Sequence, residues 1–187
     1  RITLCGEESF GTGSDHVREK DGLWAVLFWL NVLAATGESV EALVRAHWAR
    51  FGRTYYTRYD YEAIPTEAAR GVMARVREQL ATLPGTALAG RTVAHADEFA
   101  YTDPVDGSVS TAQGLRVLFD DGSRIVYRLS GTGTEGATLR VYVEGYAPGP
   151  EGLDRETREA LAPLVEAALA VSELAARTGR TGPTVIT

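Results

Sequence analysis

Two glycine-rich segments carry the side chains of this sequence that could do chemistry. The first, residues 5–22, reads Cys-Gly-Glu-Glu-Ser-Phe-Gly-Thr-Gly-Ser-Asp-His-Val-Arg-Glu-Lys-Asp-Gly and precedes a strongly apolar run. Polar loops on a rigid base are frequent binding sites. A carboxylate beside the hydroxyl of Ser9 suits sugar hydroxyl groups, which both donate and accept hydrogen bonds. Glu7 and Glu8 would point in opposite directions on an extended loop, so one of them is expected to enter the site.

The same segment does not form a known nucleophile motif. Gly6 stands three residues before Ser9, so the nucleophile elbow G-x-S-x-G is absent. Asp15 and His16 are sequence neighbours, which alone makes no catalytic triad. Arg18 and Lys20 fit an anionic ligand, but they equally fit a solvated loop in which they balance nearby acids.

The second segment, residues 130–136, reads Ser-Gly-Thr-Gly-Thr-Glu-Gly and matches G-x-G-x-x-G literally. A dinucleotide-binding loop requires a helix after this motif. Here an alternating Ala-Thr-Leu-Arg-Val-Tyr-Val run follows, which predicts a strand. The segment is therefore the connection of a β-hairpin, whose successive backbone amides can form a concave anion site.

Strand alternation predicts where the flanking arginines lie. If Leu139 and Val141 face the core, Arg140 faces away from it, and so does Arg128 on the preceding strand. Two guanidinium groups on one side of the loop suit bidentate binding of a phosphate. The alternative is a glycine-rich hairpin with two solvated arginines, and Glu135 would repel a bound dianion unless it points away.

The wider pattern predicts the elements that position these loops. In chain order they are a strand end at 2–5, a loop at 6–19, an apolar helix at 20–36 ended by Gly37, a helix capped by Ser39 and running to Trp48, an extended segment at 54–61, a helix from Pro65 to about Leu83, strands joined at Asp106-Gly107 and Asp121-Gly122, strands at 124–129 and 137–146, and a helix at 163–177.

Composition narrows the functional classes. The 187 residues carry a net charge of −6 without a long basic block, which argues against nucleic acid or an anionic membrane as the main partner. The single Cys5 allows neither an internal disulfide nor a thiolate zinc cluster. The apolar run from Leu23 to Ala35 is shorter than the about 20 residues that span a bilayer, so a buried helix and a cytoplasmic protein are expected.

Several long strings resemble the C-terminal part of a phosphoglucomutase of the α-D-phosphohexomutase superfamily. They are L-C-G-E-E-S-F-G-T-G-S-D-H-V-R-E-K-D-G-L-W, F-G-R-T-Y-Y-T-R-Y-D-Y-E, D-P-V-D-G-S-V-S, Q-G-L-R-V-L-F-D-D-G-S-R-I-V-Y-R-L-S-G-T-G and R-T-G-R-T-G-P-T-V-I-T. Their order and spacing cover the whole chain. The resemblance implies the end of a third domain at residues 1–52, as an α/β remnant. It also implies a complete fourth domain at 53–187, α+β with an antiparallel sheet and helices packed on one face.

The resemblance also implies an activity and its site residues. In that family phosphate moves between the 1- and 6-positions of glucose through glucose 1,6-bisphosphate, in a cleft between four domains. Glu7, Ser9 and Lys20 match substrate contacts of the sugar-binding loop. The phosphate-binding loop, which holds the phosphate that is not reacting, is matched by Arg128, Ser130, Gly131, Thr132, Gly133 and Arg140.

Other parts of the family's machinery are absent from this sequence. The reactive serine lies in a T-A-S-H-N-P-type segment and Mg²⁺ in a D-G-D-x-D-R-type loop, and neither string occurs here. We therefore expect no catalytic residue and no metal ligand in this chain, which alone should be inactive and should depend on N-terminal domains of the same protein. The alternatives are a non-catalytic binding or scaffold relative and a phosphohexomutase for another sugar.

Overall fold

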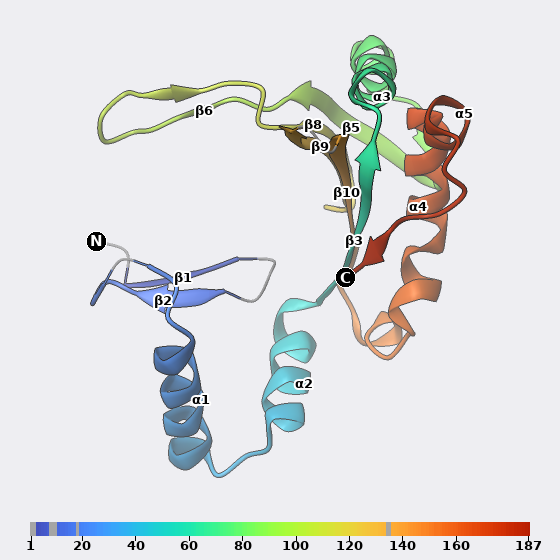
Figure 1. Ribbon diagram of the computed structural model, residues 1–187. Coiled ribbons are helices and arrows are strands. Elements are labelled where there is room, and N and C mark those ends of the chain that lie inside the picture. The colour runs from blue at the N-terminus through green and yellow to red at the C-terminus, as the bar shows by residue number, and fades with distance from the viewer. Residues whose placement is uncertain (1–2, 8–10, 18, 134–135) are drawn as a thin grey trace. The chain divides into compact units, whose positions relative to one another are not determined.

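The computed structural model describes residues 3–7, 11–17, 19–133 and 136–187. It divides into two compact units, residues 1–50 and 51–187, and each is described by itself. Figure 1 shows the elements of both units along the chain.

The first unit begins with a short hairpin. Strands β1 (Leu4–Gly6) and β2 (Thr12–Ser14) pair antiparallel, with Leu4 opposite Ser14. The prediction of a continuous loop over 6–19 is therefore wrong in part. The glycines and hydroxyls of this segment gave no strand signal, because strands of three residues are too short to show an alternating pattern.

Two helices follow, α1 (Gly22–Thr36) and α2 (Val40–Phe51). Helix α1 starts two residues later than predicted because Asp21 is its N-cap and accepts a hydrogen bond from the Trp24 amide at 3.0 Å. It ends as predicted at Gly37, whose left-handed conformation (φ 71°) lets its amide reach the Leu33 carbonyl. Ser39 likewise caps α2 by accepting from the Ala42 amide at 3.1 Å.

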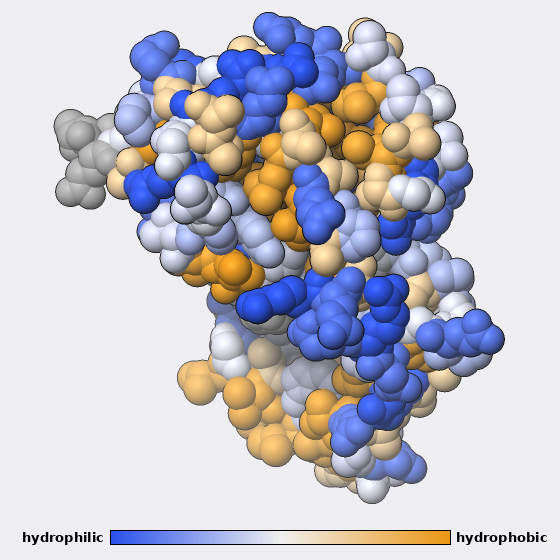
Figure 2. All heavy atoms as spheres, turned by 90° about the vertical axis from the view of Figure 1, so that its right-hand side faces the viewer, coloured by the Kyte–Doolittle hydropathy of each residue, from blue (hydrophilic) through white to orange (hydrophobic). Residues whose placement is uncertain are grey.

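The apolar side chains of α1 are exposed in this chain. Leu23 is 81% exposed, and Phe28 and Trp29 are 43% and 42% exposed. Figure 2 shows hydrophobic surface over this helix pair. The expectation of a buried helix is therefore not met within the described residues. No single described helix is both long and apolar enough to cross a membrane, whereas α1 and α2, joined at an 83° bend, meet those limits only as a pair.

The second unit is built on a seven-stranded antiparallel sheet with the order β11-β3-β10-β9-β8-β5-β4. Its strands are β3 (Arg53–Ile64), β4 (Ala87–Leu88), β5 (Arg91–Glu98), β8 (Leu115–Phe119), β9 (Arg124–Gly133), β10 (Gly136–Ala147) and β11 (Val185–Ile186). A separate hairpin of β6 (Tyr101–Thr102) and β7 (Val109–Ser110) forms around the predicted Asp106-Gly107 turn. The Asp121-Gly122 turn connects β8 to β9, as predicted.

Helices cover one face of this sheet, and the predicted fold class is confirmed. They are α3 (Thr66–Gln79), α4 (Thr157–Ser172) and α5 (Leu174–Thr178), with a 3₁₀ turn at Pro150–Gly152. The alternate residues Ile125, Tyr127, Leu139 and Val141 are fully or almost fully buried between sheet and helices. The intervening side chains lie on the opposite face, which the helices leave uncovered.

The prediction that the last helix starts at Pro163 is wrong. Helix α4 begins six residues earlier, at Thr157, and contains Pro163. A proline inside a helix leaves the carbonyl four residues before it without its amide partner. Here that carbonyl belongs to Glu159, and the Arg155 guanidinium donates to it at 3.3 Å. The helix therefore continues through the proline.

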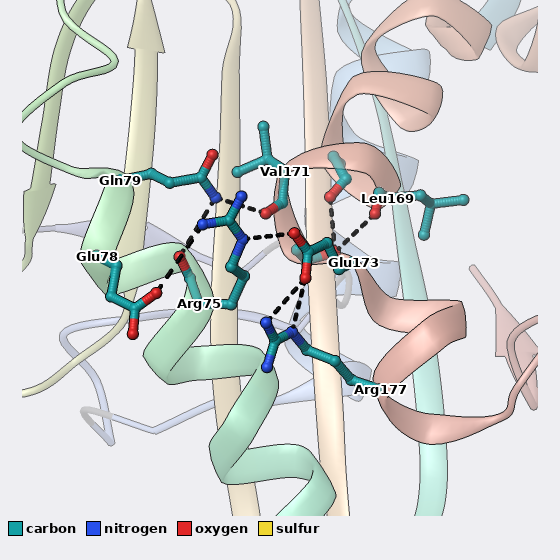
Figure 3. Close-up of polar contacts among 9 residues, drawn as sticks. Arg75, Glu78, Gln79, Leu169, Val171, Glu173 and Arg177 are labelled. Atoms are coloured by element: carbon teal, nitrogen blue, oxygen red, sulfur yellow. Dashed lines mark hydrogen bonds and ion pairs between the residues drawn. The ribbon is translucent and has the colours of Figure 1, made fainter.

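A cluster of ion pairs connects α3 with the C-terminal end of α4 and with α5 (Figure 3). Glu173 adopts a left-handed conformation (φ 50°) between the two helices. Its carboxylate lies 2.7 Å from Arg75 Nε and 2.8 Å from Arg177 Nη2. Gln79 donates to the Val171 carbonyl at 2.7 Å, which satisfies a carbonyl in the last turn of α4. These contacts set where the chain turns back to form β11.

Candidate functional site

The N-terminal hairpin brings Glu7 and Lys20 together. Lys20 Nζ lies 3.1 Å from Glu7 Oε2, and the two side chains are 52% and 46% exposed. An ammonium and a carboxylate side by side offer both donors and an acceptor to a polyhydroxyl ligand. Ser9, the third predicted sugar contact, lies outside the described residues, as do Glu8 and Arg18.

Two glycines make this approach possible. A Cβ at Gly11 would collide with the Lys20 side chain, and a Cβ at Gly13 would collide with the Glu19 carbonyl. The segment 19–20 therefore lies directly against β2, and the Asp21 amide donates to the Thr12 carbonyl at 2.9 Å. The spacing of glycines in this loop thus serves the packing of the lysine stem over the hairpin.

His16 takes part in a small polar network that the sequence did not reveal. Its Nδ1 lies 2.7 Å from Ser14 Oγ, and its Nε2 lies 3.1 Å from Asp21 Oδ2. The hydrogen bond from the Trp24 amide, and then the contact with His16, lower the pKa of Asp21 below its usual range. Because this carboxylate also caps α1, the network orders the loop end and the start of the helix.

The second predicted loop connects β9 and β10, as the alternation indicated. The strand register places Gly133 opposite Gly136, Ser130 opposite Thr138 and Arg128 opposite Arg140. Thr134 and Glu135, at the tip, lie outside the described residues. The register shifts between Ala137 and Thr138, so an irregularity stands directly beside the glycine-rich turn.

Arg128 and Arg140 share the uncovered face of the sheet. Their neighbours Tyr127 and Leu139 are fully buried on the helix side, whereas Arg128 is exposed and the Arg140 side chain is 38% exposed. Within the described part of the chain, Arg128 forms no ion pair. Directly opposite residues on one face lie about 5 Å apart, so the two guanidinium groups can reach one ligand.

The neighbouring cross-strand pairs add further charged groups to this face. Arg116 on β8 binds Asp97 on β5 in a bidentate pair at 2.8 and 2.6 Å, which lowers the pKa of Asp97. On the other side, Asp60 on β3 lies opposite Arg140. Alternation alone would place Asp60 on a polar face, but no local pattern indicates that β3 is the strand next to β10.

Gly114 and a hollow adjoin Arg128. A Cβ at Gly114 (φ 151°) would lie 3.0 Å from Arg128 Cγ, so the absence of a side chain gives room to the arginine stem. The hollow beside it measures about 650 Å³, and Arg70, Met73 and Arg77 of α3 line its opposite wall. Glu98 also lines this space and is paired with Arg77 at 2.7 Å, so the border beside the predicted phosphate-binding arginine combines charged and apolar side chains.

The described residues do not fit a metal centre. Among them, no group of three or more His, Cys, Asp or Glu side chains could hold a metal ion.

Comparison with known proteins supports one family throughout. Residues 53–184 match the family model described as phosphoglucomutase-1, C-terminal domain, and residues 1–51 match phosphoglucomutase/phosphomannomutase, alpha/beta/alpha domain III. The chain is 59% identical to a phosphoglucomutase of Rhizobium radiobacter and 51% identical to human phosphoglucomutase-1, in each case over 100% of this chain and 34% of the relative. The cytoplasmic phosphoglucomutase of Pisum sativum is 54% identical over 99% of this chain and 34% of its own length.

A solved structure agrees with the sequence comparison. The open form of the exocytosis-sensitive phosphoprotein pp63/parafusin from Paramecium, titled a phosphoglucomutase, superposes with a TM-score of 0.89 at 47% identity, over 100% of this chain and 33% of that one. The chain thus spans about a third of the length of the relatives that it matches. The chain belongs to the phosphoglucomutase family of the α-D-phosphohexomutases, and it corresponds to the C-terminal region of these proteins.

Proposed function

We propose that this chain is the substrate-binding C-terminal portion of a phosphoglucomutase that interconverts glucose 1-phosphate and glucose 6-phosphate through glucose 1,6-bisphosphate. The observation that carries the proposal is the cross-strand pair of Arg128 and Arg140 beside a glycine-rich turn. Family membership supplies the reaction, and this pair supplies a place for the phosphate group.

The proposed roles divide between two loops. Glu7, Ser9 and Lys20 contact the sugar: the lysine donates to ring or phosphate oxygens and the glutamate accepts from hydroxyl groups. The phosphate that is not reacting is held by the loop made of Arg128, Ser130, Gly131, Thr132, Gly133 and Arg140. In this proposal residues 1–52 end the third domain of the whole protein and residues 53–187 form the fourth.

Charge explains why two arginines suit the second role. A guanidinium group donates in a planar fork that matches phosphate oxygens and stays charged at every physiological pH. Backbone amides of a glycine-rich turn add donors without side-chain bulk. Such a site binds either end of a bisphosphate, which a sugar that reorients between two half-reactions requires.

Phosphoryl transfer itself belongs to the rest of the protein in this proposal. The reaction needs a nucleophile and strong stabilisation of the charge on the transferred group. The family's serine and magnesium motifs do not occur in this sequence. The partners are therefore the N-terminal domains of the same protein and a phosphosugar, and the names of the plant relatives favour the cytoplasm.

Binding to the 187-residue chain tests the proposal. Titration with glucose 1,6-bisphosphate should shift the amide resonances of residues 130–136, and added salt should weaken the effect because it screens exposed charges. Arg128→Gln and Arg140→Gln should each reduce the affinity. Arg124→Gln is the matched control, since Arg124 lies on the same strand and is paired with Glu144 at 2.6 Å. Shifts confined to other segments would refute the assignment of the phosphate loop.

Turnover tests the division of labour. The isolated chain, incubated with glucose 1-phosphate and a catalytic amount of the bisphosphate, should form no glucose 6-phosphate above the uncatalysed rate. The full-length protein should form it. Turnover by the isolated chain would show that the chemistry does not depend on the missing motifs, and inactivity of the full-length protein would favour the non-catalytic alternative.

A further inference from the structure

We infer that Asp60 is a positioning residue, which orients the Arg140 guanidinium so that its free edge meets the phosphate. The inference rests on the proposed function of the β9–β10 loop. It adds a residue that lies two strands away from Arg128 and far from both glycine-rich segments in the sequence.

The Asp60 carboxylate is buried between two arginines. Its side chain is 5% exposed. Oδ1 accepts a hydrogen bond from Arg58 Nε at 2.9 Å, and Oδ2 lies 3.6 Å from Arg140 Nε. Arg140 Nε is itself buried and forms no hydrogen bond in the described structure, so the carboxylate is the charged group that this nitrogen faces.

Strand register sets this arrangement. Arg128 on β9, Arg140 on β10 and Asp60 on β3 are direct cross-strand neighbours in one row. Like charges opposite each other repel, and opposite charges attract. Arg140 therefore has a cation on one side and an anion on the other. Both forces draw its Nε edge towards Asp60, which leaves its terminal nitrogens as donors for a ligand shared with Arg128.

The backbone of Asp60 is fixed from both sides. Strand β10 pairs with it on one side, and on the other the Thr184 amide donates to the Asp60 carbonyl at 2.7 Å. Val185 of β11 lies opposite Asp60. The C-terminal segment thus makes β3 an interior strand. The backbone that carries the Asp60 carboxylate is therefore held by hydrogen bonds on both sides and does not fray as an edge strand would.

The free-energy cost of burying the Asp60 carboxylate indicates its role. Burial of an aspartate is expensive unless it is paired. Arg58 supplies the hydrogen-bonded pair at 2.9 Å, and the second oxygen faces Arg140, the arginine that would hold phosphate. A negative charge beside a phosphate site also repels the ligand. Orientation of Arg140 must outweigh that repulsion, so removal of the charge should weaken binding rather than strengthen it.

Asp60→Asn in the 187-residue chain tests the sign, with Asp97→Asn as the matched control. Asp97 lies on the same face and is also paired with an arginine, so each variant removes one negative charge from that face. We expect Asp60→Asn to weaken glucose 1,6-bisphosphate binding about tenfold, the order of one misdirected charge-assisted hydrogen bond, and to shift the Arg140 Nε–Hε resonance. Asp97→Asn should stay within about twofold of the unchanged chain.

A double variant distinguishes positioning from a general structural role. In the Arg140→Gln background, Asp60→Asn should cause no further loss of affinity, because the carboxylate acts through Arg140. Equal or tighter binding by Asp60→Asn, or an equal loss in the Arg140→Gln background, would overturn the inference. If Asp60→Asn does not fold, Asp60→Glu serves instead, and it should weaken binding with a shifted Arg140 resonance. Failure of the unchanged chain to bind at 130–136 would instead refute the proposed function.

Discussion

Replacement of Tyr127 by phenylalanine isolates one contact between the sheet and the helix layer. Tyr127 is fully buried on β9, next to Arg128, and its hydroxyl donates to the Ala168 carbonyl of α4 at 2.8 Å. Phenylalanine keeps the ring and its packing. The substitution therefore removes a single buried hydrogen bond on the helix side of the strand that carries Arg128.

The carbonyl that loses this bond limits the cost. Ser172 Oγ also donates to the Ala168 carbonyl at 2.8 Å, so the acceptor keeps a partner. The loss is therefore that of one ordinary hydrogen bond, about 1 kcal/mol of unfolding free energy, and not the larger penalty of an unsatisfied group. For a unit of this size that corresponds to about 3 °C in Tm.

Alkaline pH adds a second signature. Burial raises the pKa of Tyr127 far above the ordinary value of 10.0. Because the folded-state pKa is raised, the hydroxyl's contribution is fully present below pH 10 and is lost as pH rises further. At pH 11 the ionisation of Tyr127 in the unfolded state lowers the stability of the unchanged protein by about 1.4 kcal/mol. The stability curves of the two proteins should therefore cross just below about pH 11.

Urea unfolding followed by far-UV circular dichroism measures these differences. All three tryptophans lie within residues 1–50, so tryptophan fluorescence would not report the sheet unit. Tyr142→Phe is the control, since Tyr142 lies on the uncovered face of β10 and its hydroxyl forms no hydrogen bond within the described residues. It should change stability by less than about 0.5 kcal/mol. No loss for Tyr127→Phe at pH 8, or a constant loss from pH 8 to 11, would refute the reasoning.

Three further predictions concern the same unit and the exposed helix. Gly114→Ala should destabilise by about 1–3 kcal/mol and reduce bisphosphate affinity, because the new Cβ would strain the backbone and displace Arg128; Gly85→Ala, at a similarly left-handed position in open space, should lose stability without losing affinity. Since Arg116 lowers the pKa of Asp97, the contribution of that carboxylate to stability is present above about pH 4 and is lost as the pH falls. The stabilities of the unchanged and Asp97→Asn proteins should therefore converge on acidification, and curves that stay parallel would contradict this. Hydrogen exchange should be fast in α1, whose apolar face is exposed, and slowest in β9 and β10; uniform protection would show that the two units unfold together.

Local patterns predicted much of the fold. The alternation along β9 and β10 placed Arg128 and Arg140 on one face, and the register confirms that they are neighbours. Gly37 marked the end of α1, because left-handed backbone favours glycine. Such signals depend on residues within one turn or one strand, so they can be read without knowledge of the rest of the chain.

Signals that depend on distant partners were missed or misread. Pro163 indicated a helix start, but an arginine eight residues earlier satisfies the carbonyl that the proline leaves free. The hairpin of β1 and β2 has no alternation of its own. At Pro163 a contact outside the local pattern thus compensates for what the local rule forbids.

The sequence by itself determined the family, the two loops and the polar character of the sheet face, since these are carried by residue types and short spacings. Only the tertiary structure decided that β3 lies beside β10, which puts a buried aspartate next to Arg140. The physical reason is that residues 60 and 140 meet through strand order, which many local patterns would allow. The sequence therefore identified the arginines that we propose bind phosphate, and the fold showed which carboxylate lies beside one of them.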